Sequence, residues 1–318
     1  MRILITGISG FIGSHLADYL SQNLQQVEIC GLVRPRSSLE NLAKIADRLR
    51  LLEGDLRDQS SLLNVLATTR PDRIFHLAGQ AAAGSSYNLA AETLYTNVLG
   101  TVHLLEGLKE LQLKPVVVLA SSAEAYGLAY SDELPIKETA SLRPLSPFGV
   151  SQAAQDLLGF QYYKTYGLKI IRARVFSVLG PRQPVYYPLS SLARQIAEIE
   201  KKKGNPVLRP GNLESKKDYT DVRDLVRALW LISEKSEPGE VYNLGSGQAW
   251  SGHEMLKLML GMTRAKMVIE TDETKTVFPE PPILLADISR LSRLTGWKPQ
   301  IHLKQSLLDL LNYWREKV

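Results

Sequence analysis

Short apolar segments alternate with helical stretches through the first half of the chain. The apolar segments have the length of strands and cover residues 2–6, 27–33, 51–55, 73–79 and 116–120. The helical stretches between them allow each strand to cross over to a parallel neighbour. The pattern therefore predicts an α/β fold with a doubly wound parallel sheet of the Rossmann type.

The pattern changes after about residue 175, where the elements become shorter and richer in arginine, proline and glycine. Such a composition suits a lobe that closes over a charged ligand. Residues 240–245 form another apolar strand, which we expect to return to the main sheet. Near the end of the chain, Leu307, Leu308, Leu311 and Trp314 recur at helical spacing and predict a packed carboxy-terminal helix.

These two patterns divide the 318 residues into two predicted parts. Residues 1–175, with a returning segment near 236–262, form the Rossmann domain. Residues 176–235 and 263–318 form a smaller, discontinuous α/β substrate-binding lobe and the carboxy-terminal helix.

A glycine-rich turn follows the first strand directly. Gly7, Gly10 and Gly13 lie between the strand at 2–6 and a helical stretch at 14–20. Glycine lets the backbone turn sharply, lets a pyrophosphate approach the amides, and lets the helix pack closely on the strand. Glycines at this spacing also occur in ordinary turns, but the order strand, turn, helix favours a dinucleotide site.

The residues after the second strand indicate which dinucleotide the chain binds. Here the chain reads Arg34-Pro35-Arg36-Ser37-Ser38, with no carboxylate to accept the ribose hydroxyls of NAD. Guanidinium and hydroxyl groups suit the 2′-phosphate of NADP. We therefore predict NADP(H); the alternative is that these residues form a solvated loop.

Charge and composition exclude several other classes of protein. The net charge of +5 comes from scattered basic residues, which favours anionic small molecules over nucleic acid as ligands.

Lys201, Lys202 and Lys203 follow a helical pattern of Leu192, Ile196 and Ile199, and we interpret them as the solvated end of that helix. Cys30 is expected to be a buried thiol, and the five histidines show no spacing for a metal site.

The amino terminus enters the first strand without a basic segment, a long apolar stretch or a cleavage site. No window of about 18 apolar residues occurs in the sequence. The sequence therefore predicts neither export nor a membrane span, and we expect a cytoplasmic protein.

Several further motifs carry a resemblance to a known family. They are His76-Leu77-Ala78-Gly79-Gln80, Asn97-Val98-Leu99-Gly100-Thr101, Ser121-Ser122-Ala123-Glu124-Ala125-Tyr126-Gly127, Gly180-Pro181-Arg182-Gln183, Asp218-Tyr219-Thr220-Asp221-Val222-Arg223-Asp224 and Gly296-Trp297-Lys298-Pro299. With the glycine turn, the chain resembles the extended short-chain dehydrogenase/reductase family, in the branch of GDP-mannose 4,6-dehydratases and GDP-4-keto-6-deoxy-mannose reductases. The resemblance implies cofactor contacts from Gly7, Gly10, Phe11, Ile12, Gly13, Arg34, Arg36, Ser37, Asp55, Leu56, Leu77, Ala78, Gly79 and Asn97.

The family's redox step uses a tyrosine and a lysine one helical turn apart, because the lysine's charge lowers the pKa of the phenol that exchanges a proton with the sugar. Phe148 and Gln152 stand at those two positions in this chain. Neither side chain can transfer a proton, so we expect the ordinary redox step to be impaired. Tyr126 has no lysine placed to activate it.

Two other residues of the family's catalytic set are retained. By resemblance, Ser122 orients the substrate and Glu124 moves the C5 proton during water elimination in the dehydratases. The alternatives are a strand-end hydroxyl that satisfies the backbone and a surface carboxylate.

The resemblance also implies substrate contacts from Arg182, Arg194, Lys217 and Arg223, although single arginines are more often in ion pairs. Ser177 replaces an asparagine of the related enzymes, and Phe278 replaces an arginine near the diphosphate. The sugar nucleotide can therefore differ from the family's usual one.

Two functions remain open at this point. One is an NADP-dependent enzyme acting on a nucleotide sugar, with a GDP-hexose favoured; the other is a catalytically silent NADP-binding regulatory protein. The changes at 148, 152, 177 and 278 favour natural divergence over an engineered inactive variant. Leu94, Val98, Val102 and Leu105 form an apolar stripe that agrees with the family's helix-mediated homodimer.

Overall fold

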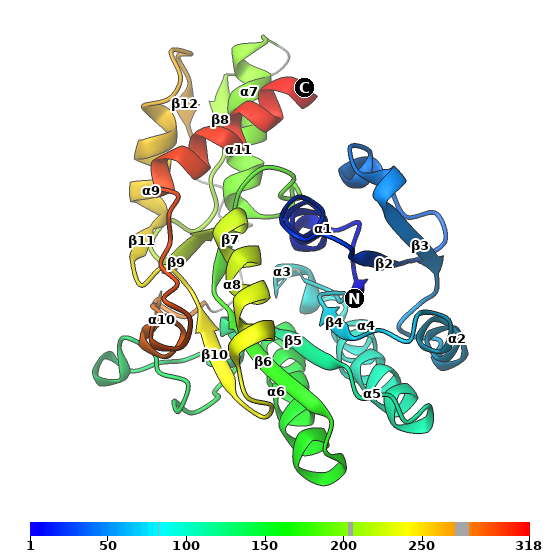
Figure 1. Ribbon diagram of the computed structural model, residues 1–318. Helices are drawn as coiled ribbons and strands as arrows, with labels where there is room; N and C mark the ends of the chain where they lie inside the picture. The colour runs from blue at the N-terminus through cyan, green and yellow to red at the C-terminus, as the bar shows by residue number, and fades with distance from the viewer. Residues whose placement is uncertain (82, 203–205, 271–279) are drawn as a thin grey trace.

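The computed structural model describes residues 1–81, 83–202, 206–270 and 280–318. Its centre is a seven-stranded parallel sheet with the order β10-β6-β5-β4-β1-β2-β3 (Figure 1). The strands are β1 (Arg2–Thr6), β2 (Glu28–Val33), β3 (Leu49–Glu53), β4 (Arg73–His76), β5 (Val116–Ser122), β6 (Lys169–Val175) and β10 (Val241–Leu244). The order reverses beside β1, as in a doubly wound sheet, and this confirms the predicted fold class.

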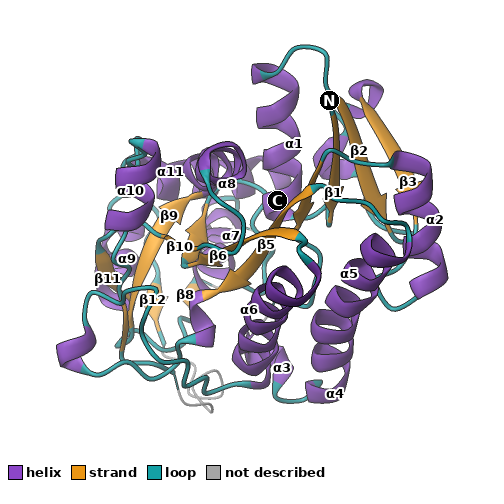
Figure 2. Cartoon of the chain, turned by 60° about the horizontal axis from the view of Figure 1, so that its bottom comes forward, coloured by secondary structure: helices purple, strands orange, loops and turns teal. Residues whose placement is uncertain are grey.

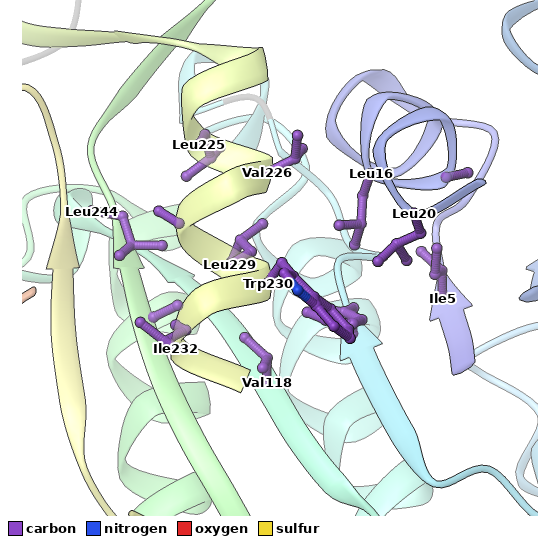
Figure 3. Close-up of a cluster of buried hydrophobic side chains, with 14 of the residues drawn as sticks. Ile5, Leu16, Leu20, Val118, Leu225, Val226, Leu229, Trp230, Ile232 and Leu244 are labelled. Atoms are coloured by element: carbon purple, nitrogen blue, oxygen red, sulfur yellow. The ribbon is translucent and has the colours of Figure 1, made fainter. Parts of the chain in front are cut away.

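Helices cover both faces of this sheet (Figures 1 and 2). One face carries α1 (Phe11–Asn23) and α8 (Val222–Lys235). The other carries α2 (Gln59–Thr69), α5 (Gly100–Glu110) and α6 (Pro147–Tyr166). Figure 3 shows Trp230 of α8 pointing toward Leu16 and Leu20 of α1, so that the two helices share one apolar core with the sheet.

A second core lies in the smaller part of the molecule, between α7 (Pro188–Glu200), α9 (Gly252–Leu260) and α11 (Leu303–Lys317). The predicted carboxy-terminal helix is confirmed as α11, which buries Leu307 and Leu311. In α7, Leu192, Ile196 and Ile199 are buried as the spacing predicted.

The strands of the smaller part are short. They are β7 (Ser177–Leu179), β8 (Val207–Leu208), β9 (Lys216–Asp221), β11 (Ala249–Ser251), β12 (Val268–Ile269) and β13 (Ile283–Leu284). β9 is central, because β7, β11 and β13 all pair with it. The remaining helical segments are α3 (Ala83–Ser86), α4 (Ala90–Leu94), α10 (Ser289–Thr295), a π-helix (Tyr95–Leu99) and short 3₁₀ turns at Glu40–Leu42, Ala46–Arg48, Ala123–Ala125 and Ser131–Glu133.

The segment predicted to return to the main sheet does so as β10, which pairs in parallel with β6. The two-part division of the chain stays a prediction. α8 and α10 fall in ranges given to the substrate lobe, but they pack on the core of the main sheet. We propose that both belong with the larger part.

Cys30 and the lysines at the end of α7 lie in the environments that the sequence predicted, as far as they are described. Cys30 is fully buried, and burial raises the pKa of its thiol to about 11. Lys201 and Lys202 are exposed at the end of α7, whereas Lys203 lies outside the described residues. Within the described ranges, no helix is long and apolar enough to cross a membrane, and no group of three or more potential metal ligands occurs.

Candidate functional site

The glycine turn forms a tight cradle at the carboxyl end of β1. Gly7 has a φ of +73°, and a Cβ on Gly13 would lie 2.2 Å from the Gly7 carbonyl oxygen. Only glycine therefore allows α1 to pack so closely on the turn. Gly10 precedes α1 and offers no side chain to cap it. The first N–H groups of a helix without a side-chain cap are suited to an anion such as a pyrophosphate.

The end of β4 lies against this turn. A Cβ on Gly7 would lie 2.9 Å from the Ala78 nitrogen. Beyond Ala78 and Gly79, the Asn97 Oδ1 accepts a hydrogen bond from the Gln80 N–H at 2.7 Å. Asn97 lies in the π-helix Tyr95–Leu99, a distortion often found at functional sites. The structure thus brings the predicted cofactor residues of β1, β4 and this helix together.

The loop after β2 presents two free cations. Arg34 and Arg36 are exposed, and Arg36 has a φ of +62°. The Ser37 N–H donates to the Arg34 carbonyl at 3.1 Å, which closes a turn between them. Among the described residues, neither guanidinium forms an ion pair, although the charge of Arg34 helps to lower the pKa of Asp55.

Two predicted cofactor residues follow β3. Asp55 already has a partner, because Arg57 lies 3.0 Å from its carboxylate. Burial raises the pKa of Asp55, but the hydrogen bonds from Arg57 outweigh burial and hold this pKa below its usual value. Leu56 is buried against Gly100.

Helix α6 carries Phe148 and Gln152 on its inner side. The Ser146 hydroxyl accepts from the Gly149 N–H at 3.0 Å, and Pro147 occupies the first turn, so the helix begins immediately before Phe148. Phe148 and Gln152 are both buried and one turn apart. The Gln152 Nε2 donates to the Gln155 Oε1 at 2.7 Å. No ionisable group therefore stands at either position.

Glu124 follows β5 and lies close to groups from the smaller part of the molecule. Its N–H donates to the Ser122 hydroxyl at 3.2 Å. Burial raises the pKa of Glu124, the charge of Lys217 on β9 lowers it, and Glu280 raises it further. Lys217 lies 3.4 Å from the Glu280 carboxylate. Burial therefore favours the protonated form of this carboxyl group relative to a carboxyl group in water.

The remaining basic candidates have carboxylate partners. Arg182 pairs with Asp18 of α1 at 2.7 Å, and Arg194 pairs with Glu198 at 2.8 Å. Arg223 lies between Asp221 and Asp309, at 2.8 and 2.6 Å. A ligand phosphate would have to compete with these carboxylates. Only Lys217 is close to Glu124, while Ser177 begins β7 and Phe278 lies outside the described residues.

The Tyr126 hydroxyl is engaged by buried neighbours. Its hydroxyl donates to the Asn243 Oδ1 at 2.7 Å and accepts from Arg174 at 2.9 Å. Burial raises the pKa of Tyr126 to about 12. The Tyr126 side chain is therefore a buried structural phenol.

The sequence of the whole chain decides its family. The family model for GDP-mannose 4,6 dehydratase matches residues 4–310. This chain belongs to the GDP-mannose 4,6 dehydratase family. The resemblance that the motifs predicted is thereby confirmed, whereas the roles of the individual site residues stay predictions.

Relatives in this family cover nearly the full chain. The chain is 32% identical over 317 residues to GDP-6-deoxy-D-mannose reductase of Pseudomonas aeruginosa, covering 100% of this chain and 98% of that protein. It is 26% identical over 339 residues to GDP-mannose 4,6 dehydratase of Homo sapiens, covering 97% of this chain and 90% of that protein.

Solved structures show the same fold. The RMD protein of Pseudomonas aeruginosa, complexed with NADPH, superposes with a TM-score of 0.86 at 32% identity and covers 100% of this chain and 99% of that one. UDP-glucose 4-epimerase of Thermotoga maritima, with UDP-glucose, gives a TM-score of 0.87 at 27% identity, again with 100% and 99% coverage. The dehydratase family and these neighbours share the extended short-chain dehydrogenase/reductase architecture.

Proposed function

We propose that this chain binds NADP(H) at the glycine turn, with the 2′-phosphate between Arg34 and Arg36. The cradle supports this proposal, because a Cβ on Gly13 would fill it. The unpaired guanidinium groups at the end of β2 favour the phosphorylated cofactor over NAD. When bound, such a cofactor supplies a hydride donor or acceptor. The NADPH complex of the Pseudomonas aeruginosa relative agrees with this assignment.

The second ligand that we propose is a nucleotide sugar, with a GDP-hexose favoured. The names of the relatives in both branches, a GDP-6-deoxy-D-mannose reductase and GDP-mannose 4,6 dehydratases, support this class. Lys217 is the cation placed closest to Glu124 and would have to exchange Glu280 for a ligand oxygen. Ser177, Arg182, Arg194 and Arg223 remain candidates for further contacts.

The proposed activity rests mainly on one observation: Phe148 and Gln152 lie one turn apart on the inner side of α6. In a 4,6-dehydratase or a 4-keto-6-deoxy-sugar reductase, the side chain at position 148 would have to exchange a proton with the sugar, and the side chain at position 152 would have to lower its pKa. Loss of a general acid or base typically costs about 10²- to 10⁴-fold in rate. Glu124 can still move a proton, so we propose a family member whose redox step is impaired rather than a chain without any chemistry.

The same pair of residues favours a second candidate function. A catalytically silent protein that retains NADP(H) as a ligand and acts through a partner would need the glycine cradle but neither proton-transfer group. An engineered inactive variant would look the same at these two positions.

The double substitution Phe148→Tyr with Gln152→Lys separates these candidates. We expect it to raise turnover of a GDP-hexose with NADP(H) by about 100-fold, since it restores the acid and its cationic partner. The matched control is Gln161→Lys, which adds the same positive charge at an exposed position of α6. If GDP-, dTDP- and UDP-sugars all fail to bind, or if restoration leaves turnover unchanged, the silent protein is the better account.

We also propose that the chain forms a homodimer through α6 and the helical segment 90–99. Large apolar side chains are exposed on both, between 37% and 58%. They are Leu94, Tyr95, Leu99, Val150, Leu157 and Phe160. A second copy of the chain would remove this surface from water.

A further inference from the structure

A buried chain of polar side chains runs beneath the glycine turn. Its members come from β1, β4, α5 and α6, and none is more than 6% exposed. We call it the Thr6–Gln152 chain, and it consists of Thr6, His76, Thr101, Gln155 and Gln152. It begins at the last residue of β1 and ends at the position where the related enzymes carry lysine.

One contact of Thr101 fixes the direction of each hydrogen bond that this residue forms. The Thr101 hydroxyl donates to the Asn97 carbonyl oxygen at 2.6 Å, and a carbonyl can only accept. The Thr101 oxygen must therefore accept from the Gln155 Nε2 at 2.8 Å and from the His76 Nε2 at 3.2 Å. His76 consequently carries its proton on Nε2.

The other end of the chain follows from that tautomer. The bare Nδ1 of His76 accepts from the Thr6 hydroxyl at 2.9 Å. The Thr6 oxygen in turn accepts from the N–H groups of Leu77 and Ala78 at 3.1 and 3.2 Å. The Ala78 nitrogen is also one of the atoms that a Cβ on Gly7 would meet, at 2.9 Å. All members thus satisfy one another in a single arrangement that contains no charge.

Gln155 joins this arrangement to the substituted position. Its Oε1 accepts from Gln152 while its Nε2 donates to Thr101, so one amide serves both neighbours. A parallel connection runs from Ser151, the residue before Gln152, because the Asn97 Nδ2 donates to the Ser151 hydroxyl at 2.8 Å. Asn97 also holds Gln80 at the end of β4. Residues 151 and 152 are therefore tied to both ends of the cofactor cradle.

We propose that Thr101 and His76 are positioning residues that hold the end of β4 against Gly7 and fix Gln152, so that cofactor affinity depends on this neutral chain of hydrogen bonds. The inference rests on the proposed NADP(H) function. Thr101 is the junction of the chain, since three of its hydrogen bonds meet at one oxygen. Burial also lowers the pKa of His76 to about 4, which keeps the ring neutral at physiological pH.

Substitution of Thr101 tests the positioning role. Thr101→Val removes the hydroxyl at which these hydrogen bonds meet. We expect NADPH to bind about tenfold more weakly in a fluorescence titration, because a tenfold change corresponds to the free energy of about one hydrogen bond. Thr101→Ser retains the hydroxyl and should restore affinity to within about twofold of the unsubstituted protein.

Thr69→Val is the matched control for a purely structural effect. Thr69 is also buried in a helix, and its hydroxyl donates to the Val65 carbonyl four residues earlier at 2.7 Å, but it lies outside the chain. It should lower thermal stability as Thr101→Val does while leaving NADPH affinity unchanged. Equal affinities of Thr101→Val and the unsubstituted protein would overturn the proposal, as would an equal loss in Thr69→Val.

The nitrogen-15 shifts of His76 give a readout that needs neither cofactor nor substitution. The proposal predicts the Nε2–H tautomer alone, unchanged between about pH 8 and 6, because the ring is neutral and both nitrogens are engaged. The Nδ1–H tautomer, or a mixture, would overturn it. If the unsubstituted protein binds no NADPH, the proposed function fails, and the tautomer still decides whether the Thr6–Gln152 chain exists.

Discussion

Two histidines are buried in neutral form on either side of the main sheet. His76 belongs to the Thr6–Gln152 chain, and the His15 Nε2 on α1 lies 3.0 Å from the Pro181 carbonyl oxygen. Burial lowers the pKa of each ring from 6.5 to about 4. In the unfolded chain both would take up a proton near pH 6.5, so their burial makes stability depend on pH.

The free energy of unfolding should therefore fall on mild acidification. The contribution of each histidine is complete above about pH 6.5 and is lost as the pH falls toward 4, because the unfolded chain then binds more protons than the folded one. At pH 5 the loss is about 2 kcal/mol per histidine. Urea unfolding at pH 7 and pH 5 measures this loss of unfolding free energy. Between these two pH values, the unfolding free energy of His76→Gln should fall by about 2 kcal/mol less than that of the unsubstituted protein. The exposed His253→Gln serves as the control; an equal loss in all three proteins would contradict this account.

At the residue scale, the sequence predicted which chemical groups lie in the candidate site better than it predicted which side chains pair with them. The spacing of Gly7, Gly10 and Gly13 predicted the cradle, because backbone geometry depends on local residues. The Glu280 partner of Lys217 was missed because it comes from a distant segment of the folded chain, whereas the Gln155 partner of Gln152 was missed although it lies only three residues further along α6. The Arg194–Glu198 pair could have been predicted, because its members are four residues apart on one helix.

At the scale of elements, α6 has two faces with different tasks. Its inner side holds Phe148 and Gln152 beneath the candidate site, while Val150, Leu157 and Phe160 are exposed on its outer side. The helix runs beside α5, as Figure 2 shows. An apolar outer face on a helix whose inner face already covers the sheet is the feature that supports self-association.

Substitution of one outer residue tests the dimer. We expect Leu157→Glu to shift the protein from dimer to monomer in sedimentation velocity at micromolar concentration, because a buried unpaired carboxylate costs several kcal/mol in an interface. Val268→Glu is the control, since Val268 is as exposed as Leu157 but lies on β12. A monomeric unsubstituted protein, or a dimer that tolerates Leu157→Glu, would refute the assignment of this face.

At the scale of the whole molecule, every strand of the main sheet except β6 was predicted, whereas helices α7 and α11 of the smaller part were predicted and its strands were not. The strands of the main sheet are continuous apolar segments separated by helices, a pattern that identifies buried parallel strands. The strands around β9 contain two to six residues and are distant in sequence, so pairing rather than local pattern determines them. Similarly, the apolar stripe of α8 predicts a buried face but not which part of the molecule covers it.

The central claim is that the larger part holds NADP(H) although α6 lacks the groups that use it. Calorimetric titration with NADPH and with NADH, on the unsubstituted protein and on Arg34→Ala with Arg36→Ala, tests this claim most directly. We predict that NADPH binds at least about tenfold more tightly than NADH, and that the ratio falls close to one in the double variant, since charge-assisted contacts to the 2′-phosphate are lost. Equal affinity for the two cofactors, or no binding of either, would contradict the account.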